Sequence, residues 1–379
     1  MGDISFYLRL AWVFTVICWA LSMYCRSKPI DKIGGIGQPL PNPLCLVVCI
    51  LAYVPFSGLR TDSGDTFYYI HDFELIEPNG TIDYKFGGGT LYNLLLEIVK
   101  ETVNDFHYLI MLTAIISLVP VLVVLYKYSH PFDLSVYLFM ATGYFGLSMN
   151  GIRQYTATGV LMLGTKFLFS TKKTAFIKYA VIVFLAWMIH KSALIMIFVF
   201  WFVRRKAWRP SSFLLMFGSI VAVSLFDMFL PSFLKGLEET SYSNYSDNGW
   251  FTNGEEHGSS AIRVVVSAVP IVIAYFSRAR MRQLGHIGDI LTNMGFVHMA
   301  LYVISTYNWI FARFAIYTSV YYIMLLSWVV YNGVQKKDRG LYYAACVGLY
   351  YYYSTYQSYT LKAYVSDIFF PWETFFGGK

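Results

Sequence analysis

Residues 106–126 read FHYLIMLTAIISLVPVLVVLY, a stretch without a single Asp, Glu, Lys or Arg. A helix of about 20 apolar residues can cross the roughly 30 Å hydrocarbon core of a bilayer. Comparable apolar runs recur along the chain, at roughly 4–25, 44–59, 106–126, 134–150, 154–170, 174–189, 191–203, 211–234, 261–277, 290–309, 311–333 and 341–356. This pattern predicts an all-α, polytopic integral membrane protein with about 12 transmembrane helices.

The composition supports this class. Of the 379 residues, 57% are hydrophobic and only 13% are charged, about half the charged share of an average soluble protein. We expect residues 1–379 to form a single transmembrane domain. The net charge is +7, but Lys and Arg occur in short groups between apolar runs and not on one basic face. This distribution argues against a nucleic-acid partner.

The orientation follows from the positive-inside rule, which counts Lys and Arg in short connections. With the N-terminus outside, 18 of the 29 Lys and Arg fall at inner positions: Arg26, Lys28, Lys32, Lys127, Lys166, Lys172, Lys173, Lys178, Arg204, Arg205, Lys206, Arg209, Arg278, Arg280, Arg282, Lys336, Lys337 and Arg339. The two long connections, 60–105 and 235–260, then face outward. Residues 91–104 have the apolar spacing of an amphipathic helix lying along the outer membrane surface.

Four arginines stand at the outer ends of apolar runs, where the rule disfavours them: Arg60, Arg153, Arg263 and Arg313. A guanidinium keeps its charge and binds phosphate oxygens through two parallel hydrogen bonds, so a cluster of them suits a lipid diphosphate. The neighbouring Gln154 could add an amide contact to phosphate or carbohydrate. The alternative for any one arginine is snorkelling or an ion pair with an acid in a nearby loop.

His190 lies between two apolar runs, in AWMIHKSALIM. Its near-neutral reference pKa makes it the best candidate for a catalytic base towards an attacking hydroxyl, with Asp65 as the second candidate. The alternative is a hydrogen-bonded interior histidine. A GxSxG motif is absent, so acyl-enzyme chemistry has little support.

Metal and cofactor sites find little support. Asp62, Asp65, His71 and Asp72 could bind a hard cation, but their spacing matches no EF-hand and a solvated loop is favoured. The five cysteines lack CxxC spacing and argue for neither metal nor disulfides. The inner connections hold no Gly-rich phosphate cradle, so we expect no nucleotide and no other cofactor.

Four short motifs follow one another along the chain: GLR with a following DT and tyrosines (Gly58–Arg60, Asp65, Thr66, Tyr68, Tyr69), GIRQ with Ala157 (Gly151–Gln154), IHKSALI (Ile189–Ile195) and ARFAIY (Ala312–Tyr317). As an ordered series they resemble the EpsG and Wzy group of bacterial polysaccharide polymerases. The resemblance covers residues 50–320 loosely and is specific only as a series. No motif carries over to the 235–260 connection.

The resemblance implies a membrane glycosyltransferase that joins oligosaccharide repeat units carried on undecaprenyl diphosphate, at the outer face of the bacterial cytoplasmic (inner) membrane. The donor and acceptor are then lipid-linked, and a chain-length regulator protein is a possible partner. On this basis Tyr317, in the last motif, joins Arg60, Arg153, Gln154, Arg263 and Arg313 as a substrate-binding residue.

Two other classes use similar residues. A transporter or flippase for a lipid-linked or soluble anion would also need arginines and a membrane histidine, although we detect no internal repeat of the kind that alternating access often leaves. A membrane acyltransferase would need an acyl-donor site on the inner face, for which the short inner connections offer nothing.

Overall fold

The computed structural model describes residues 6–33, 36–77, 86–226, 228, 258–357 and 361–366, and these are mostly helical. The helices are α1 (Phe6–Tyr24), α2 (Pro43–Gly58), α3 (Thr66–Glu74), α4 (Thr90–Thr102), α5 (Phe106–Tyr128), α6 (Phe132–Ala141), α7 (Tyr144–Leu147), α8 (Ile152–Leu163), α9 (Thr165–Leu168), α10 (Ala175–Trp187), α11 (Ile195–Val203), α12 (Pro210–Ser224), α15 (Ala261–Phe276), α16 (Arg278–Met281), α17 (His286–Ser305), α18 (Ala312–Tyr331) and α19 (Arg339–Gln357). Short 3₁₀ turns are η1 (Lys191–Leu194), η2 (Arg282–Leu284) and η3 (Trp309–Phe311). The strands are β1 (Arg26–Ile33), β2 (Ile36–Pro41), β3 (Arg60–Asp62) and β4 (Val365–Ser366).

The all-α membrane class is confirmed, but the count of about 12 spans is not. Among the described residues, four segments are long and apolar enough to cross a bilayer: α1, α5, α17 and Trp309–Tyr331. A fifth counts if α15 and the segment Arg278–Leu284, bent by 82°, form one span. Each of the other apolar runs contains a helix, but these helices are shorter or less apolar.

A glycine explains one of the shortened helices. The runs 134–150 and 154–170 are each divided, the first between α6 and α7 at Gly143 and the second between α8 and α9 at Gly164, which itself has a right-handed helical conformation. Gly143 has φ +82°, a left-handed conformation that interrupts a helix and that L side chains rarely adopt. Apolar composition alone does not reveal such a break.

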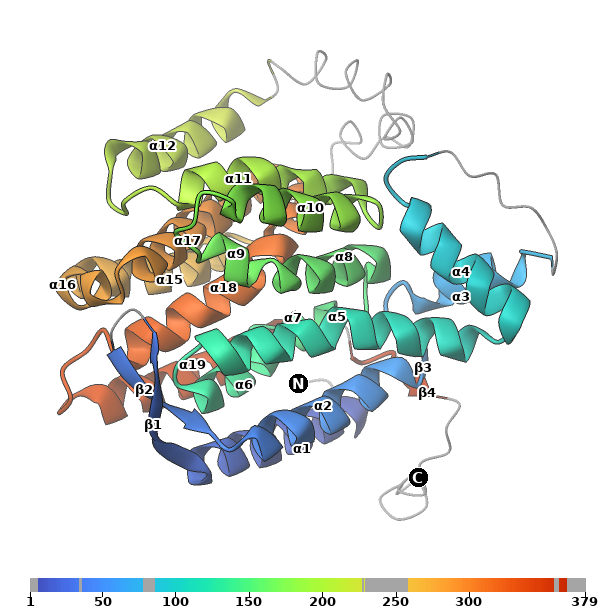
Figure 1. Cartoon of the computed structure of the whole chain (residues 1–379), viewed down its shortest axis with the longest axis horizontal. Helices are drawn as coiled ribbons and strands as arrows, with labels where there is room; N and C mark the ends of the chain where they lie inside the picture. Colours follow the sequence, from blue (N-terminus) through green and yellow to red (C-terminus); the bar gives the residue numbers. More distant parts are fainter. Residues whose placement is uncertain are drawn as a thin grey trace.

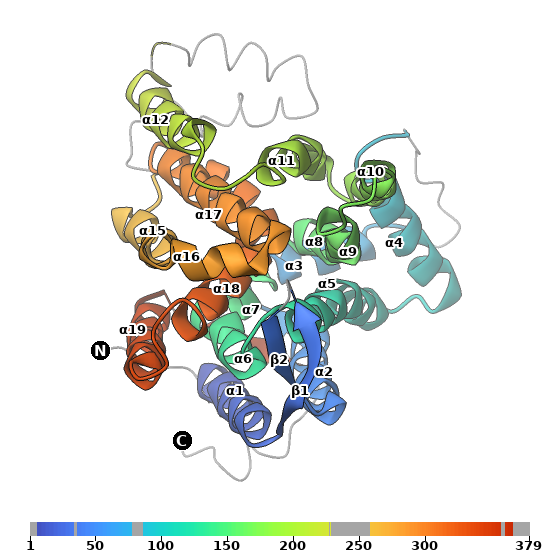
Figure 2. The same ribbon diagram turned by 60° about the vertical axis from the view of Figure 1, so that its left-hand side comes forward.

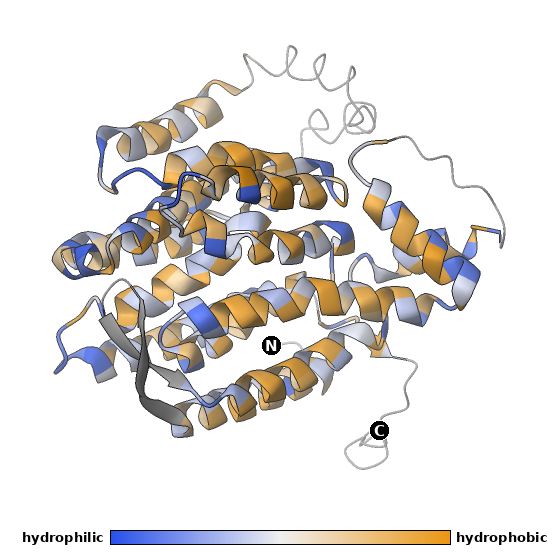
Figure 3. Cartoon of the chain, in the orientation of Figure 1, coloured by the Kyte–Doolittle hydropathy of each residue, from blue (hydrophilic) through white to orange (hydrophobic). Residues whose placement is uncertain are grey.

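The connections between the helices lie at two opposite ends of the molecule. The β1–β2 hairpin, the α11–α12 connection, α16 and the α18–α19 connection gather at the left of Figure 1, whereas α3 and α4 lie at the right. These are the connections that the positive-inside rule assigns to opposite sides of the membrane; which end faces inward stays a prediction. Figure 3 shows hydrophobic residues along the helices, with hydrophilic ones gathered at the connections. Residues 78–85 and 235–257 of the two long outer connections lie outside the described part of the chain.

The centre of the molecule is built around α18, most of whose residues are buried. It packs against α17, α15, α8, α6 and α19, and Figure 2 shows α6 and α7 between α18 and α1. The helices α5 and α8 approach each other closely at Gly159. A Cβ there would lie 2.0 Å from the carbonyl oxygen of Ile116, so only glycine allows this packing distance.

Two strand pairs were not predicted. Strands β1 and β2 form an antiparallel hairpin, and β3 pairs with β4 near the end of the chain. The expected amphipathic helix over 91–104 is present as α4. The Tyr364 hydroxyl donates a hydrogen bond to the carbonyl of Phe56, and the Ser366 hydroxyl donates to that of Leu59 at 2.7 Å. These bonds fix the β3–β4 pair to the end of α2.

Candidate active site

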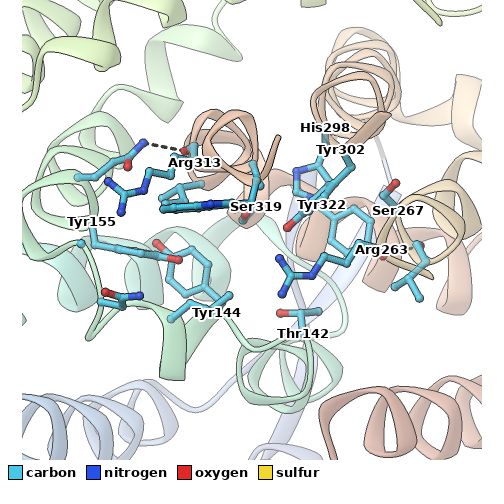
Figure 4. A pocket seen from close by; sticks show the side chains of 18 of the residues that line it. Thr142, Tyr144, Tyr155, Arg263, Ser267, His298, Tyr302, Arg313, Ser319 and Tyr322 are labelled. Carbon is cyan, nitrogen blue, oxygen red and sulfur yellow. Dashed lines mark hydrogen bonds between the residues drawn. The ribbon is translucent and has the colours of Figure 1, made fainter. Parts of the chain in front are cut away.

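A cavity of about 250 Å³ opens where α8, α15, α17, α18 and α19 meet. Arg263 of α15 and Arg313 of α18 extend into it from opposite sides (Figure 4). Its wall is otherwise rich in aromatic and hydroxyl groups, contributed by Thr142, Tyr144, Tyr155, Ser267, His298, Tyr302, Trp309, Ser319, Tyr322, Tyr350 and Tyr353. We call it the first cavity. It thus holds two of the four arginines singled out from the sequence.

A second cavity of about 650 Å³ adjoins the first. The two share Leu147, Arg263 and Trp309 in their linings. The second is bounded by α1, by the glycines 143 and 146, by residues 258–260 and by Leu361 near the end of the chain. Arg263 therefore faces both spaces, and a ligand longer than the first cavity can extend past it into the second.

Gln154 and Arg313 meet at the first cavity, as the grouping of their motifs at one membrane level predicts. The Gln154 amide donates a 2.7 Å hydrogen bond to the main-chain carbonyl of Arg313, and the guanidinium of Arg313 lies 5.1 Å from the centre of the Trp309 ring. Both residues line the cavity. Gln154 is buried, so its amide fixes the start of α18 and with it the position of the arginine.

His190 belongs to a compact cluster with Ser192 and Tyr317. Its Nδ1 lies 2.8 Å from the Ser192 hydroxyl and 3.1 Å from the Tyr317 hydroxyl, and these two hydroxyls are 2.7 Å apart. Among the residues that the structure describes, these two are the hydrogen bonds of the ring, and both use Nδ1. Tyr317 stands one helical turn after Arg313 on α18, hence on the same side of the helix. The cluster lies near enough to Arg313 for its charge to act on His190, although His190, Ser192 and Tyr317 are not part of the cavity lining.

His190 lies in the connection between α10 and η1, outside both helices. Burial, together with the positive charges of Arg153, Arg313 and Lys191, lowers the pKa of His190. Each of these influences opposes the imidazolium form. At neutral pH the ring is therefore neutral, which is the form able to accept a proton.

Arg153 lies on the other side of α8, beneath the start of α4. Its guanidinium is 4.9 Å from the centre of the Tyr92 ring, and its buried Nε has no hydrogen-bond partner in the described residues. A Cβ on Gly89 would lie 2.4 Å from Arg153 Nη2, and one on Gly88 would lie 2.0 Å from Lys191 Cγ. The glycines thus let the start of α4 close over Arg153 and the residues beside His190.

Asp65, the second candidate base, has a structural contact. Its Oδ2 accepts a 3.1 Å hydrogen bond from the main-chain N–H of Gly151, at the start of α8. It therefore lies near Arg153, and both residues act electrostatically on the hydroxyl of Tyr69. This position suits a residue that fixes the start of α8.

Arg60 is set apart from the first cavity. It is almost fully buried, its Nε donates to the Thr66 hydroxyl at 2.8 Å, and its Nη1 donates to both the carbonyl and the hydroxyl of Ser57. Burial lowers the pKa of Arg60 to about 10, so the side chain remains charged at neutral pH. Much of its donor capacity is directed to protein groups, and it joins α2 to α3.

The described residues contain no group of three or more His, Cys, Asp or Glu placed to hold a metal ion. Asp62, Asp65, His71 and Asp72, which we considered as possible ligands, do not come together as such a group.

Several lining residues escaped the sequence analysis. His298 is hydrogen-bonded to the Thr318 hydroxyl at 2.8 Å and stacks on Tyr322 at 4.6 Å. Tyr350 and Tyr353 of α19 also line the first cavity, while Tyr351 and Tyr352 are 51% and 70% exposed. The three-residue spacing that places two of them on one helix face was the available signal.

Comparison with known proteins gives one match. The model of the EpsG family matches residues 44–374, which is most of the chain and includes every site residue described above. No curated protein and no solved structure matches the chain.

Proposed function

The chain belongs to the EpsG family, and we propose that it is a polysaccharide polymerase that joins oligosaccharide repeat units carried on undecaprenyl diphosphate. The family implies a function of the polysaccharide-polymerase type in a membrane-embedded protein. The donor lipid, the outer face of the cytoplasmic membrane as the place of reaction, and a chain-length regulator as partner are part of the proposal.

One observation carries the proposal: Arg263 and Arg313 enter the same aromatic cavity from opposite sides. When a sugar chain leaves its lipid carrier, the bond between its anomeric carbon and the diphosphate breaks, and negative charge grows on the diphosphate. Fixed guanidinium groups stabilise such charge because they need no reorganisation during the reaction. Tyrosine rings and hydroxyls around them offer both apolar contact and hydrogen bonds to a sugar.

The acceptor hydroxyl forms the new bond to the anomeric carbon and must lose its proton. We assign that proton to His190 Nε2, because Nδ1 makes both hydrogen bonds to Ser192 and Tyr317. This role requires the tautomer with the proton on Nδ1, which then donates to a neighbouring hydroxyl and leaves the Nε2 lone pair free. The cluster thereby orients the imidazole, and its hydroxyls are able to accept the hydrogen bond that Nδ1 donates in this tautomer.

The two cavities suit substrates of different length. At about 250 Å³ the first is near the lower end for ligand pockets, so it fits a sugar and its phosphates but not a whole oligosaccharide. The adjoining space of about 650 Å³ gives the remaining sugars room beyond Arg263.

Purified protein in detergent, supplied only with repeat units on undecaprenyl diphosphate, tests the proposal. Wild-type protein should form longer chains without any nucleotide, and Arg313→Gln should bind the donor more weakly and elongate slowly. Arg282→Gln, an exposed arginine of η2, is the matched control and should behave as wild type. A transporter or flippase would form no longer chains, because it changes no covalent bond, so binding without elongation would refute the polymerase.

A further inference from the structure

A basic cavity of about 280 Å³ lies far from the candidate active site. It is formed by α16 and η2, which precede the start of α17, and by the connection from the end of α18 to the start of α19. The first cavity is lined by residues towards the opposite ends of α17, α18 and α19. Its lining comprises Arg280, Met281, Gln283, Leu284, Asn332, Val334, Lys336 and Arg339. In Figure 1 these segments lie at the left end of the molecule, the end that we assign to the inner side of the membrane.

Three cations and no acidic residue line this cavity: Arg280, Lys336 and Arg339. Arg280 donates to the main-chain carbonyl of Gly333 at 3.2 Å, and the Arg339 guanidinium lies 4.0 Å from the centre of the Tyr331 ring. Within the described part of the chain, none of the three forms an ion pair with a carboxylate. The cavity therefore concentrates positive charge that the protein leaves uncompensated.

Two hydrogen-bond donors beside these charges are buried and unpaired. Arg339 Nε and Asn332 Nδ2 have no hydrogen-bond partner among the described residues, and both side chains line the cavity. Buried donors are rarely left unsatisfied in folded proteins, because losing water without gaining a partner is unfavourable. Because these two atoms are themselves shielded from solvent, an anion in the cavity would be held first by the three cationic groups, and would meet the unpaired donors once the two side chains turn toward it.

A cavity of about 430 Å³ continues from the basic one and shares Arg280 and Val334 with it; its wall on α15 is apolar, and its opposite wall includes the polar Gln335. Val272, Ile273 and Phe276 of α15 line it, and Phe276 and Val272 are 83% and 51% exposed. A ligand with its anionic group at Arg280 would thus have an apolar path along α15 for an attached chain. Its one acidic lining residue is Asp338.

We propose that the basic cavity binds the phosphate of an anionic phospholipid, whose acyl chain follows the apolar α15 wall of the adjoining cavity. Arg280 and Arg339 bind the phosphate oxygens, Asn332 turns to donate a further hydrogen bond, and Lys336 adds long-range attraction. Basic pockets between transmembrane helices on the cytoplasmic side suit such headgroups. The lipid would join the segment after the 82° bend between α15 and α16 to the α18–α19 connection.

Thermal unfolding of the purified full chain in neutral detergent, titrated with three ligands, tests this proposal. Phosphatidylglycerol should raise the unfolding midpoint more than phosphatidylcholine or inorganic phosphate. The double variant Arg280→Gln/Arg339→Gln should lose about 30-fold in apparent affinity, from about 1 kcal/mol for each charge near the surface. Lys337→Gln is the control, since Lys337 is exposed in the same connection but does not line the cavity.

Two outcomes would overturn the proposal. An equal response of the double variant and wild type to phosphatidylglycerol would exclude this site. A shift with inorganic phosphate that matches phosphatidylglycerol would assign the site to a soluble phosphate and reject the lipid. If the double variant does not fold, Asn332→Asp gives the same test, because it keeps the side-chain shape and adds a repelling charge. Chain elongation is not the readout, so this test stands apart from that of the polymerase.

Discussion

Replacing His190 with alanine removes the base that we assign to the acceptor hydroxyl. A positioned base contributes about 10² to 10⁴-fold to a chemical step, so elongation of lipid-linked units should fall by that factor. Donor binding should change little, because the charges that attract the diphosphate belong to Arg263 and Arg313, which line the first cavity. His107→Ala is a matched control on the outer side, since His107 is paired with Asp105 and lies at the start of α5.

Removing one hydrogen bond around His190 should have a smaller effect on the elongation rate than removing the imidazole. Tyr317→Phe removes one hydroxyl that lies 3.1 Å from His190 Nδ1 and 2.7 Å from Ser192, while the 2.8 Å contact from Ser192 to His190 remains. The loss of about 1 kcal/mol for one such hydrogen bond corresponds to roughly fivefold in rate. In the His190→Ala background the same change should have almost no effect on elongation. An effect of the same size in both backgrounds would show that Tyr317 does not act through the imidazole.

The pH dependence provides a third measurement of the same group. Burial and the nearby cations lower the pKa of His190. In a plot of elongation rate against pH, the acid limb, where the rate falls as His190 is protonated, should therefore lie below the ordinary imidazole pKa of about 6.5. Arg313→Gln removes one of these cations, which favours the imidazolium and raises the pKa, so the limb should move to higher pH. Full activity of His190→Ala, or an acid limb that does not respond to Arg313→Gln, would refute the assignment.

Three further predictions concern binding, packing and topology. Arg263→Lys keeps the charge but loses the two-pronged guanidinium, so elongation should fall while the unfolding temperature is unchanged; equal activity would remove Arg263 from the diphosphate site. Gly159→Ala should destabilise the protein by about 1–3 kcal/mol in thermal unfolding, because its Cβ would lie 2.0 Å from a carbonyl oxygen of α5, whereas Gly348→Ala, with nothing within 4 Å, should not. A cysteine at exposed position 101 should react with an impermeant thiol reagent added from outside and one at exposed position 206 should not; the reverse would invert the orientation.

The sequence was sufficient to predict the helical membrane class, because apolar runs of helical length and a low charge content determine it. It could not supply the helix breaks, since these depend on backbone conformations such as φ +82° at Gly143. The count of about 12 full spans therefore stays unconfirmed. Local composition does not show where one helix stops and a second begins at an angle.

The candidate site was predicted in part. Gln154 and Arg313 are 159 positions apart yet hydrogen-bonded, and they were grouped only because both stand at the outer ends of apolar runs. The same reasoning placed Arg60 with them, but its donors are directed to Ser57 and Thr66. Ser192 and His298 were missed as site residues because a polar residue in an apolar run gives no indication of the face on which it lies. Only the packing of α17, α18 and η1 supplies that information.

The β3–β4 pair affects how mutations near the end of the gene should be interpreted. A premature stop codon after position 357 would leave every helix of the described residues intact, and a screen would readily score the deleted part as dispensable. The lost segment includes Leu361 of the second cavity, Tyr364, which is bonded to the Phe56 carbonyl, and the strand that pairs with Arg60. Inactive nonsense alleles and failed carboxyl-terminal fusions would thus report damage to the substrate path, and an affinity tag placed after this strand needs a spacer.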